Sequence, residues 1–141
     1  MTAAFPDFPL FTQANAQTAF DFVYAPWIKD VGLTDFEVRE GFCAMRLPLQ
    51  GKLKFFSGAI CGQALMSAID TVASRAAATS PQRGRGTVYQ HTHFLRPAAN
   101  DDFRIEAQVK RVGKSSPYVE CAVTFAASGE LVAHGVLEFA F

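Results

Sequence analysis

The sequence lacks the features that mark several protein classes. Its three cysteines are an odd number at wide spacing without a CxxC pair, a pattern that fits neither a disulfide framework nor a zinc site. No segment reaches the roughly 18 to 20 uninterrupted apolar residues that span a bilayer, and the first residues lack the basic start of a targeting signal. The 13 basic and 13 acidic residues cancel, so no global field attracts nucleic acid or an anionic membrane. We therefore expect a cytoplasmic protein with no nucleic-acid, membrane, metal or cofactor partner.

The most informative stretch is SGAICGQALMSAIDTVASRAAA, residues 57–78. It is rich in alanine and apolar residues and is too long for a strand, so we predict a helix that starts at Ser57 or Gly58 and stops before Pro81. A single carboxylate, Asp70, lies in its middle. Burying an acid among alanines is costly unless it is paired or has chemistry to perform. The two interpretations of Asp70 are therefore a structural acid, paired with Arg75 or Arg96, and a catalytic acid.

The rest of the chain predicts one α+β domain over residues 1–141. Residues 11–23 have helical spacing, and residues 1–30 form an N-terminal helix and a connector that packs Trp27 and Ile28 on the body. Residues 35–49 alternate like a first strand, with Gly41 at a hairpin or bulge. Four further β-rich segments after residue 86 are separated by AAND, KS and SGE, which predicts a meander. We expect a five-stranded antiparallel sheet wrapped closely round the alanine-rich helix.

The order of these elements and the short sequence motifs in them resemble those of the hotdog-fold acyl-CoA thioesterases, in particular the PaaI-like branch. The resemblance runs from about Val31 to Phe141. The family begins its long central helix with His-Gly-Gly and carries an acid seven residues after the last glycine; here CGQALMSAID places Cys61, Gly62, Gln63 and Asp70 at that spacing. HFLRPA and RVGKSSPYVECAV also resemble family signatures. The chain departs from the family at Cys61, at Gln63 and at Phe55, where the family often has Asn or Gln. The resemblance implies a hotdog fold, in which a curved antiparallel sheet wraps a long central helix, and thioester hydrolysis without a cofactor.

Thioester hydrolysis needs a base or nucleophile and donors for the developing oxyanion. Asp70 can supply the first, and the backbone N–H of Gly62 at the start of the helix can supply the second. Eight residues of helix separate them by about 12 Å, which is too far for one chain to present both groups to one carbonyl. We therefore expect a homodimer with antiparallel helices, alone or as a dimer of dimers. The resemblance also assigns Ser74, one turn after Asp70, to holding the water or the carboxylate; the alternative is a hydrogen bond to its own helix backbone.

Other residues are candidates for substrate contacts. The family resemblance favours Lys114, Ser115 and Ser116 for coenzyme A over Arg83 and Arg85, and it places Cys61, Gln63 and Phe55 near the substrate. For Cys61 we favour packing over a role as a nucleophile. His91 and His93 share a strand face, which is more typical of an interface or substrate contact than of a metal site, and His91 is a candidate for the acyl pocket.

Two further function classes stay open. One is a non-catalytic acyl-CoA binding protein on the same fold, suggested by Cys61 and Gln63 in place of His and Gly. The other is a hydratase or dehydratase acting on enoyl thioesters, for which a His paired with the acid is not recognisable. Hydrolysis is the leading hypothesis.

Overall fold

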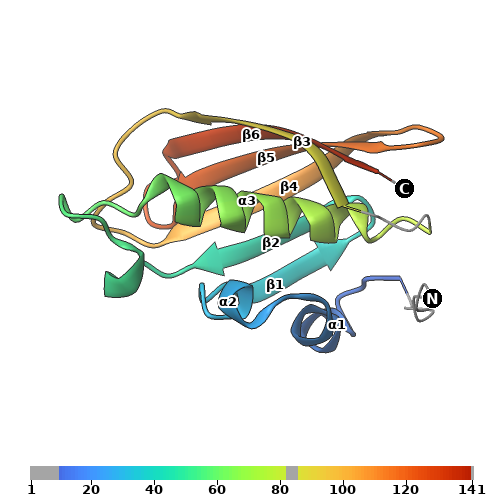
Figure 1. Ribbon diagram of the computed structural model, residues 1–141, viewed down its shortest axis with the longest axis horizontal. Helices are drawn as coiled ribbons and strands as arrows, with labels where there is room; N and C mark the ends of the chain where they lie inside the picture. Colours follow the sequence, from blue (N-terminus) through green and yellow to red (C-terminus); the bar gives the residue numbers. More distant parts are fainter. Residues whose placement is uncertain (1–9, 82–85, 141) are drawn as a thin grey trace, which may run out of the picture.

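A long helix, α3, lies in the hollow of a curved antiparallel sheet (Figure 1). The computed structural model describes residues 10–81 and 86–140. In chain order, the elements are α1 (Ala16–Val23), α2 (Pro26–Lys29), β1 (Thr34–Arg39), β2 (Phe42–Leu47), the short 3-10 helix η1 (Gly51–Leu53), α3 (Gly62–Ala77), β3 (Gly86–Phe94), β4 (Phe103–Val112), β5 (Pro117–Phe125) and β6 (Leu131–Ala140). The predicted α+β hotdog fold is confirmed.

The sheet has six strands in the order β1-β2-β4-β5-β6-β3, so the predictions of five strands and of a four-strand meander were wrong. The predicted first strand is a hairpin, because Gly41, with a φ of +71°, allows a tight turn between β1 and β2. Only β4, β5 and β6 form a meander. The residues between β3 and β4 cross the end of the sheet, which leaves β3 at the far edge, paired with β6.

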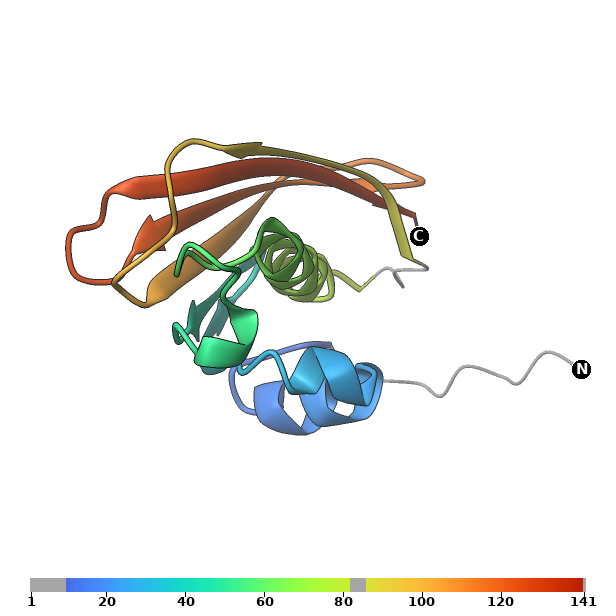
Figure 2. The ribbon, with the colours of Figure 1, turned by 60° about the vertical axis from the view of Figure 1, so that its left-hand side comes forward.

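The small residues of α3 let the sheet approach the helix closely. Ala68, Ala73 and Ala76 have no exposed surface, and Ile69 is equally buried. On β6, a Cβ at Gly135 would lie 3.3 Å from the Ile69 side chain, so a larger residue there would push the helix away. Figure 2 shows the sheet curling round one side of α3, with α1 and α2 on the other. Side chains alternate along β4, so that Phe103, Ile105 and Ala107 are buried against the helix.

The helix α3 begins at Gly62, four or five residues later than predicted. Residues before it form a turn instead: the Phe55 amide bonds to the Ala59 carbonyl, and Lys54 forms an isolated bridge with Ile60. These two contacts fix the conformation of the loop over residues 54–60, just before the helix starts. The apolar composition of the loop resembles that of a helix, and only the backbone pairing separates the two.

The N-terminal segment packs on β1 through aromatic rings. Phe11 and Phe20 are buried, and their ring centroids lie 6.0 and 5.5 Å from that of Phe36. The predicted helix over residues 11–23 is shorter, starting at Ala16. Ile28 packs against the core as expected, but Trp27 is 63% exposed, so the prediction that it packs on the body was wrong.

In the described part of the chain, no helix has both the length and the apolar character needed to cross a bilayer. Cys43, Cys61 and Cys121 are free thiols. A cytoplasmic location stays a prediction.

Candidate active site

One side of α3 is left uncovered by the sheet and carries a polar stripe. Its members follow helical spacing and are half-buried or exposed: Gln63, Ser67, Asp70 and Ser74. We call this set the α3 stripe. On one flank it meets β3, and on the other it meets the segment of α1 and α2, as the contacts below show.

Asp70 is half-buried and is held by β3. Its carboxylate accepts a hydrogen bond of 2.6 Å from the hydroxyl of Thr87. One turn earlier, the side-chain amide of Gln90 donates to the Met66 carbonyl at 3.2 Å. Arg75 and Arg96, the partners considered for a structural acid, bond elsewhere: Arg75 donates to Tyr24, and Arg96 donates to the Leu131 carbonyl and pairs with Glu130.

Ser74 lies against the N-terminal segment. Its hydroxyl donates to the Thr71 carbonyl at 2.8 Å, the backbone bond weighed as an alternative, and it is in close contact with the hydroxyl of Tyr24. Arg75 Nε donates to the same Tyr24 oxygen at 2.9 Å. Burial raises the pKa of the Tyr24 phenol, while Arg75 and Ser74 act in the opposite direction. Tyr24 therefore ties α1 to the stripe one turn after Asp70.

The start of α3 presents free amides. Cys61 is the N-cap, without a side-chain cap bond, and its carbonyl accepts the first helical bonds from the amides of Ala64 and Leu65. The amides of Gly62 and Gln63 precede these bonds, as expected in the first turn of a helix. Cys61 is half-buried and packs against the core, and Gln63 is exposed. A Cβ at Gly62 would lie 3.4 Å from the ring of Phe94 at the end of β3.

Asp70 and the Gly62 amide face different parts of the molecule. Phe94, beside Gly62, belongs to one end of the sheet, whereas Thr87, beside Asp70, belongs to the other end of the same strand. Gly62 and Asp70 are eight positions apart, which is about 12 Å of helix. The described chain does not bring the two predicted catalytic groups together.

The predicted coenzyme A residues lie in the turn between β4 and β5. Thr87 of β3 pairs with Phe139 of β6. The neighbouring residue of β6, Glu138, pairs with Tyr118 of β5, which in turn pairs with Arg111 of β4. The turn that follows Val112 is thus at the end of the sheet where Thr87 contacts Asp70. Lys114 and Ser115 are exposed there, and the Ser116 hydroxyl donates to Glu138 at 3.0 Å.

His91 lies apart from the α3 stripe in the described chain. Gln90 is on the β3 face that contacts α3, so its neighbour His91 is on the opposite, outer face of the sheet. Arg83 and Arg85 lie outside the described residues. Within residues 10–81 and 86–140, no group of three or more His, Cys, Asp or Glu side chains is arranged to hold a metal ion.

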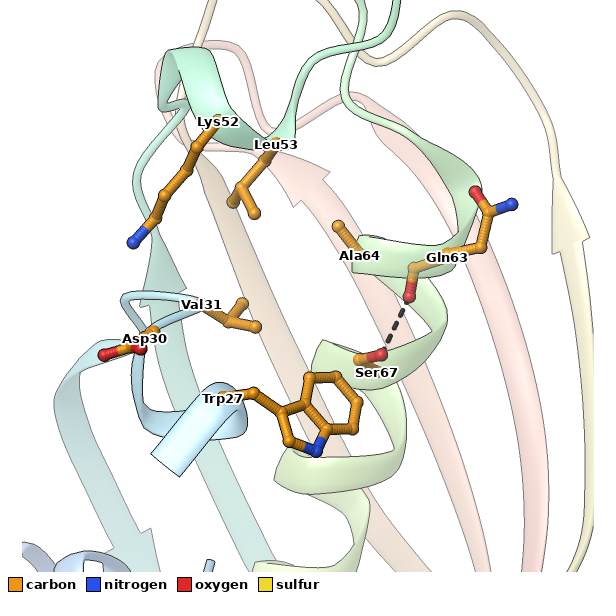
Figure 3. Close-up of a pocket in the computed structure, with 8 residues that line it drawn as sticks. All are labelled: Trp27, Asp30, Val31, Lys52, Leu53, Gln63, Ala64 and Ser67. Atoms are coloured by element: carbon orange, nitrogen blue, oxygen red, sulfur yellow. Dashed lines mark hydrogen bonds between the residues drawn. The ribbon is translucent and has the colours of Figure 1, made fainter. Parts of the chain in front are cut away.

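A pocket of about 350 Å³ opens beside the first half of α3 (Figure 3). Its floor is apolar, with Val31, Leu53 and Ala64, and the exposed Trp27 indole forms a wall next to Ser67. Its remaining lining residues are Asp30, Lys52 and Gln63. Phe55 is not among them; it is 47% exposed in the turn before α3, where it makes an edge contact with Phe56.

Sequence reasoning missed three residues of this region: Tyr24, Trp27 and Thr87. A lone tryptophan after Pro26 in a short polar connector was a usable signal for an exposed functional ring. Tyr24 and Thr87 carry no signal, because only the packing of α1 and β3 beside α3 brings them to the stripe.

Comparisons with known proteins agree with the fold described above. A family model described as the thioesterase superfamily matches residues 58–132. A protein of Thermoplasma volcanium that is named as an esterase, TV1331, is 32% identical over 98 residues, which are 69% of this chain and 74% of that one.

Two solved structures show the same fold. PaaI of E. coli, from the phenylacetic acid degradation operon, has a TM-score of 0.77 at 21% identity, over 91% of this chain and 94% of PaaI. A thioesterase-type protein of Streptococcus pneumoniae, solved with coenzyme A, has a TM-score of 0.77 at 16% identity, over 89% of this chain and 97% of that one.

Proposed function

The chain belongs to the thioesterase superfamily, and we propose that it is an acyl-CoA thioesterase whose active sites form between two copies of the chain. Thioester-type hydrolysis follows from the family. The acyl-CoA substrate, the catalytic residues and the dimer are the proposal.

The position of Asp70 relative to Gly62 carries this proposal. Asp70 is the acid of the α3 stripe, and it acts as general base on water or as nucleophile on the thioester carbonyl. The Gly62 amide, at the positive end of the helix dipole, stabilises the oxyanion. Since about 12 Å of helix separates them, each site combines Asp70 of one chain with Gly62 of its partner.

An antiparallel pair of α3 helices satisfies this requirement. The free edge of β3 supports it, because β3 pairs only with β6 and leaves a row of backbone groups open on its other side. Val88 is 64% exposed on this strand, and Phe94 is 50% exposed at its end. Apolar side chains along an open edge favour pairing with a second copy. We propose a homodimer, alone or as a dimer of dimers.

The turn with Lys114, Ser115 and Ser116 is the proposed contact for coenzyme A. It lies at the end of the sheet where Thr87 contacts Asp70, and an antiparallel partner brings its own Gly62 toward that end. The Lys114 ammonium is exposed and available for a phosphate. The structural neighbour from Streptococcus pneumoniae was solved with coenzyme A, which supports this ligand class.

The pocket beside Trp27 is the proposed acyl site. It adjoins Gln63 and Ala64 directly after Gly62, so an acyl group whose carbonyl lies at the Gly62 amide reaches it without crossing the stripe. Its apolar floor suits a hydrocarbon body. Ser74 has a proposed supporting role: it lies one turn from Asp70, and because its proton is donated to the Thr71 carbonyl, its oxygen would hold the water as an acceptor.

The test is a complementation experiment with two variants that are each expected to be inactive. Asp70→Asn removes the base and is expected to lower kcat about a hundredfold or more. Gly62→Pro removes only the amide donor: proline is tolerated at the first helical position, and Cys61, with φ −70° and ψ 147°, is already in the extended conformation that precedes proline. Gly62→Ala, which keeps the N–H, is the matched control.

Co-expressed chains form mixed dimers in which one site has both an intact Asp70 and an intact Gly62. We expect such a mixture to recover about a quarter of wild-type activity in a symmetric dimer. No recovery from two folded, inactive variants would contradict the shared site, and full activity of Asp70→Asn would remove Asp70 from the mechanism.

The second candidate is a non-catalytic acyl-CoA binding protein, favoured by Cys61 at the N-cap where the resembled family has His. It predicts saturable binding of acyl-CoA by calorimetry without release of free thiol. Measuring both binding and release of free thiol with a panel of acyl-CoA esters distinguishes the two functions.

A further inference from the structure

We propose that His91 and His93 form a two-histidine chelate for a divalent transition metal ion, Cu²⁺ or Ni²⁺, on the outer face of the sheet. This site is separate from the α3 stripe and does not depend on the proposed hydrolysis. Both residues belong to β3 and are exposed.

The distance between the two rings carries the proposal. Nε2 of His91 and Nε2 of His93 share a hydrogen bond of 2.9 Å, with ring centroids 4.5 Å apart and ring planes at 64°, so the two nitrogens already face each other at this spacing. Two nitrogens bound to one metal at about 2.05 Å and at a right angle to each other are about 2.9 Å apart. A tetrahedral angle would need about 3.3 Å. The spacing therefore fits neighbouring positions of a tetragonal or square-planar ion, the geometry of Cu²⁺ and Ni²⁺ with nitrogen ligands.

The strand holds this spacing in place. Residues i and i+2 of a strand share a face, so β3 fixes both imidazoles on one side without a loop or a hinge. The Tyr89 ring stacks on His91 at a centroid distance of 6.5 Å and an interplanar angle of 9°, which restrains that ring. One Nε2 donates the hydrogen bond, so metal binding requires that ring to take the tautomer with its proton on Nδ1. Because both imidazoles are exposed, the rings can then rotate so that both Nε2 lone pairs point to one ion, and water completes the coordination shell.

The neighbouring strands supply compatible charge. His134 of β6 is directly opposite His93, and its Nε2 lies 3.3 Å from the Glu120 carboxylate. The Glu120 carboxylate adds negative charge to this face of the sheet, which lowers the electrostatic cost of bringing a dication to it. His134 is already paired in this way, so we assign the chelate to His91 and His93.

The experiment is a titration of the full chain, without an affinity tag, with CuCl₂ and in a second series with NiCl₂. Calorimetry is expected to show one ion bound per chain, and the Cu²⁺ resonance spectrum is expected to show coupling to imidazole nitrogen. His91→Gln and His93→Gln are each expected to weaken binding about tenfold or more. His134→Gln is the matched control on the same face and is expected to leave the affinity unchanged.

Thermal unfolding gives an independent measurement. Cu²⁺ is expected to raise the Tm of the wild type and not that of the double variant His91→Gln with His93→Gln, since an ion that binds only the folded chelate stabilises it. All three side chains are replaced at exposed or half-exposed positions, so the variants should fold without metal as the wild type does. Unchanged binding by the double variant, or a loss in His134→Gln equal to that in His91→Gln, would overturn the assignment.

Discussion

The hydroxyl of Thr87 donates a 2.6 Å hydrogen bond to the carboxylate of Asp70. This bond links the acid in the middle of α3 to the first residues of β3, the strand at the open edge of the sheet. The acid is therefore oriented by the same strand that is proposed to meet a second copy of the chain.

Removing this bond is expected to lower activity without unfolding the protein. Thr87→Val keeps the shape of the side chain but leaves the carboxylate without its donor, and a hydrogen bond to a charged group contributes about 1.5–3 kcal/mol. We expect kcat for an acyl-CoA ester to fall about tenfold or more while KM changes little. Thr87→Ser restores the hydroxyl and serves as the control; equal activity of the two variants would show that the bond does not orient Asp70.

The Trp27 indole is expected to set affinity for the acyl group. Trp27→Ala removes one wall of the pocket and should raise KM about fivefold, with kcat nearly unchanged, while Trp27→Phe keeps a flat ring and most of the affinity. Trp27 is the only tryptophan in the chain, so its intrinsic fluorescence reports on this pocket alone. An emission spectrum that does not respond to saturating acyl-CoA would argue that the acyl group lies elsewhere.

The Tyr24 phenol is expected to make stability depend on pH in the alkaline range. Burial raises the pKa of this phenol above its usual value of 10.0, so the folded state holds the proton more tightly than the unfolded state. Its contribution is complete below pH 10 and is lost as the pH rises through the raised pKa. Tyr24→Phe should lower the free energy of unfolding by about 1 kcal/mol at neutral pH. In urea titrations from pH 8 to 11, it should also show a smaller alkaline decline than the wild type.

The three thiols are expected to differ in reactivity. Cys43 and Cys121 have no exposed surface, and burial raises the pKa of the Cys43 thiol to about 12 and also raises that of Cys121. At pH 8 a thiol reagent should therefore modify Cys61 alone in the folded chain. Cys61→Ala should keep activity within about twofold, because a thiol in this place contributes packing. Complete loss of hydrolysis in a folded Cys61→Ala variant would instead support Cys61 as a nucleophile.

Lys114 is expected to contribute to binding of the coenzyme A phosphates. Lys114→Ala should raise KM about threefold at low salt and less at high salt, because an exposed charge is screened. Lys110→Ala, an exposed lysine on the outward face of β4, is the matched control. Identical effects of the two variants would indicate a general charge effect and not a binding turn.

The sequence alone was sufficient to predict the fold class and the acid of the candidate site. Alanines at close helical spacing indicated a helix that a sheet can approach closely, and the separation of eight positions between Gly62 and Asp70 predicted that one chain cannot complete the site. Both inferences rest on local geometry, since helix rise and side-chain size do not depend on the rest of the fold.

Only the tertiary structure decided how the sheet is ordered and what surrounds Asp70. The residues between β3 and β4 have the composition of a simple turn, yet they carry the chain across the sheet, because β3 completes the wrap round α3 by pairing with β6. The position of β3 beside β6 brings Thr87 to Asp70 and leaves the other side of β3 as an open edge of the sheet. It also places His91 on the outer face of the sheet. These contacts join separate elements of the chain, and the burial of the apolar side of α3 against the sheet selects them, not any local pattern of residues.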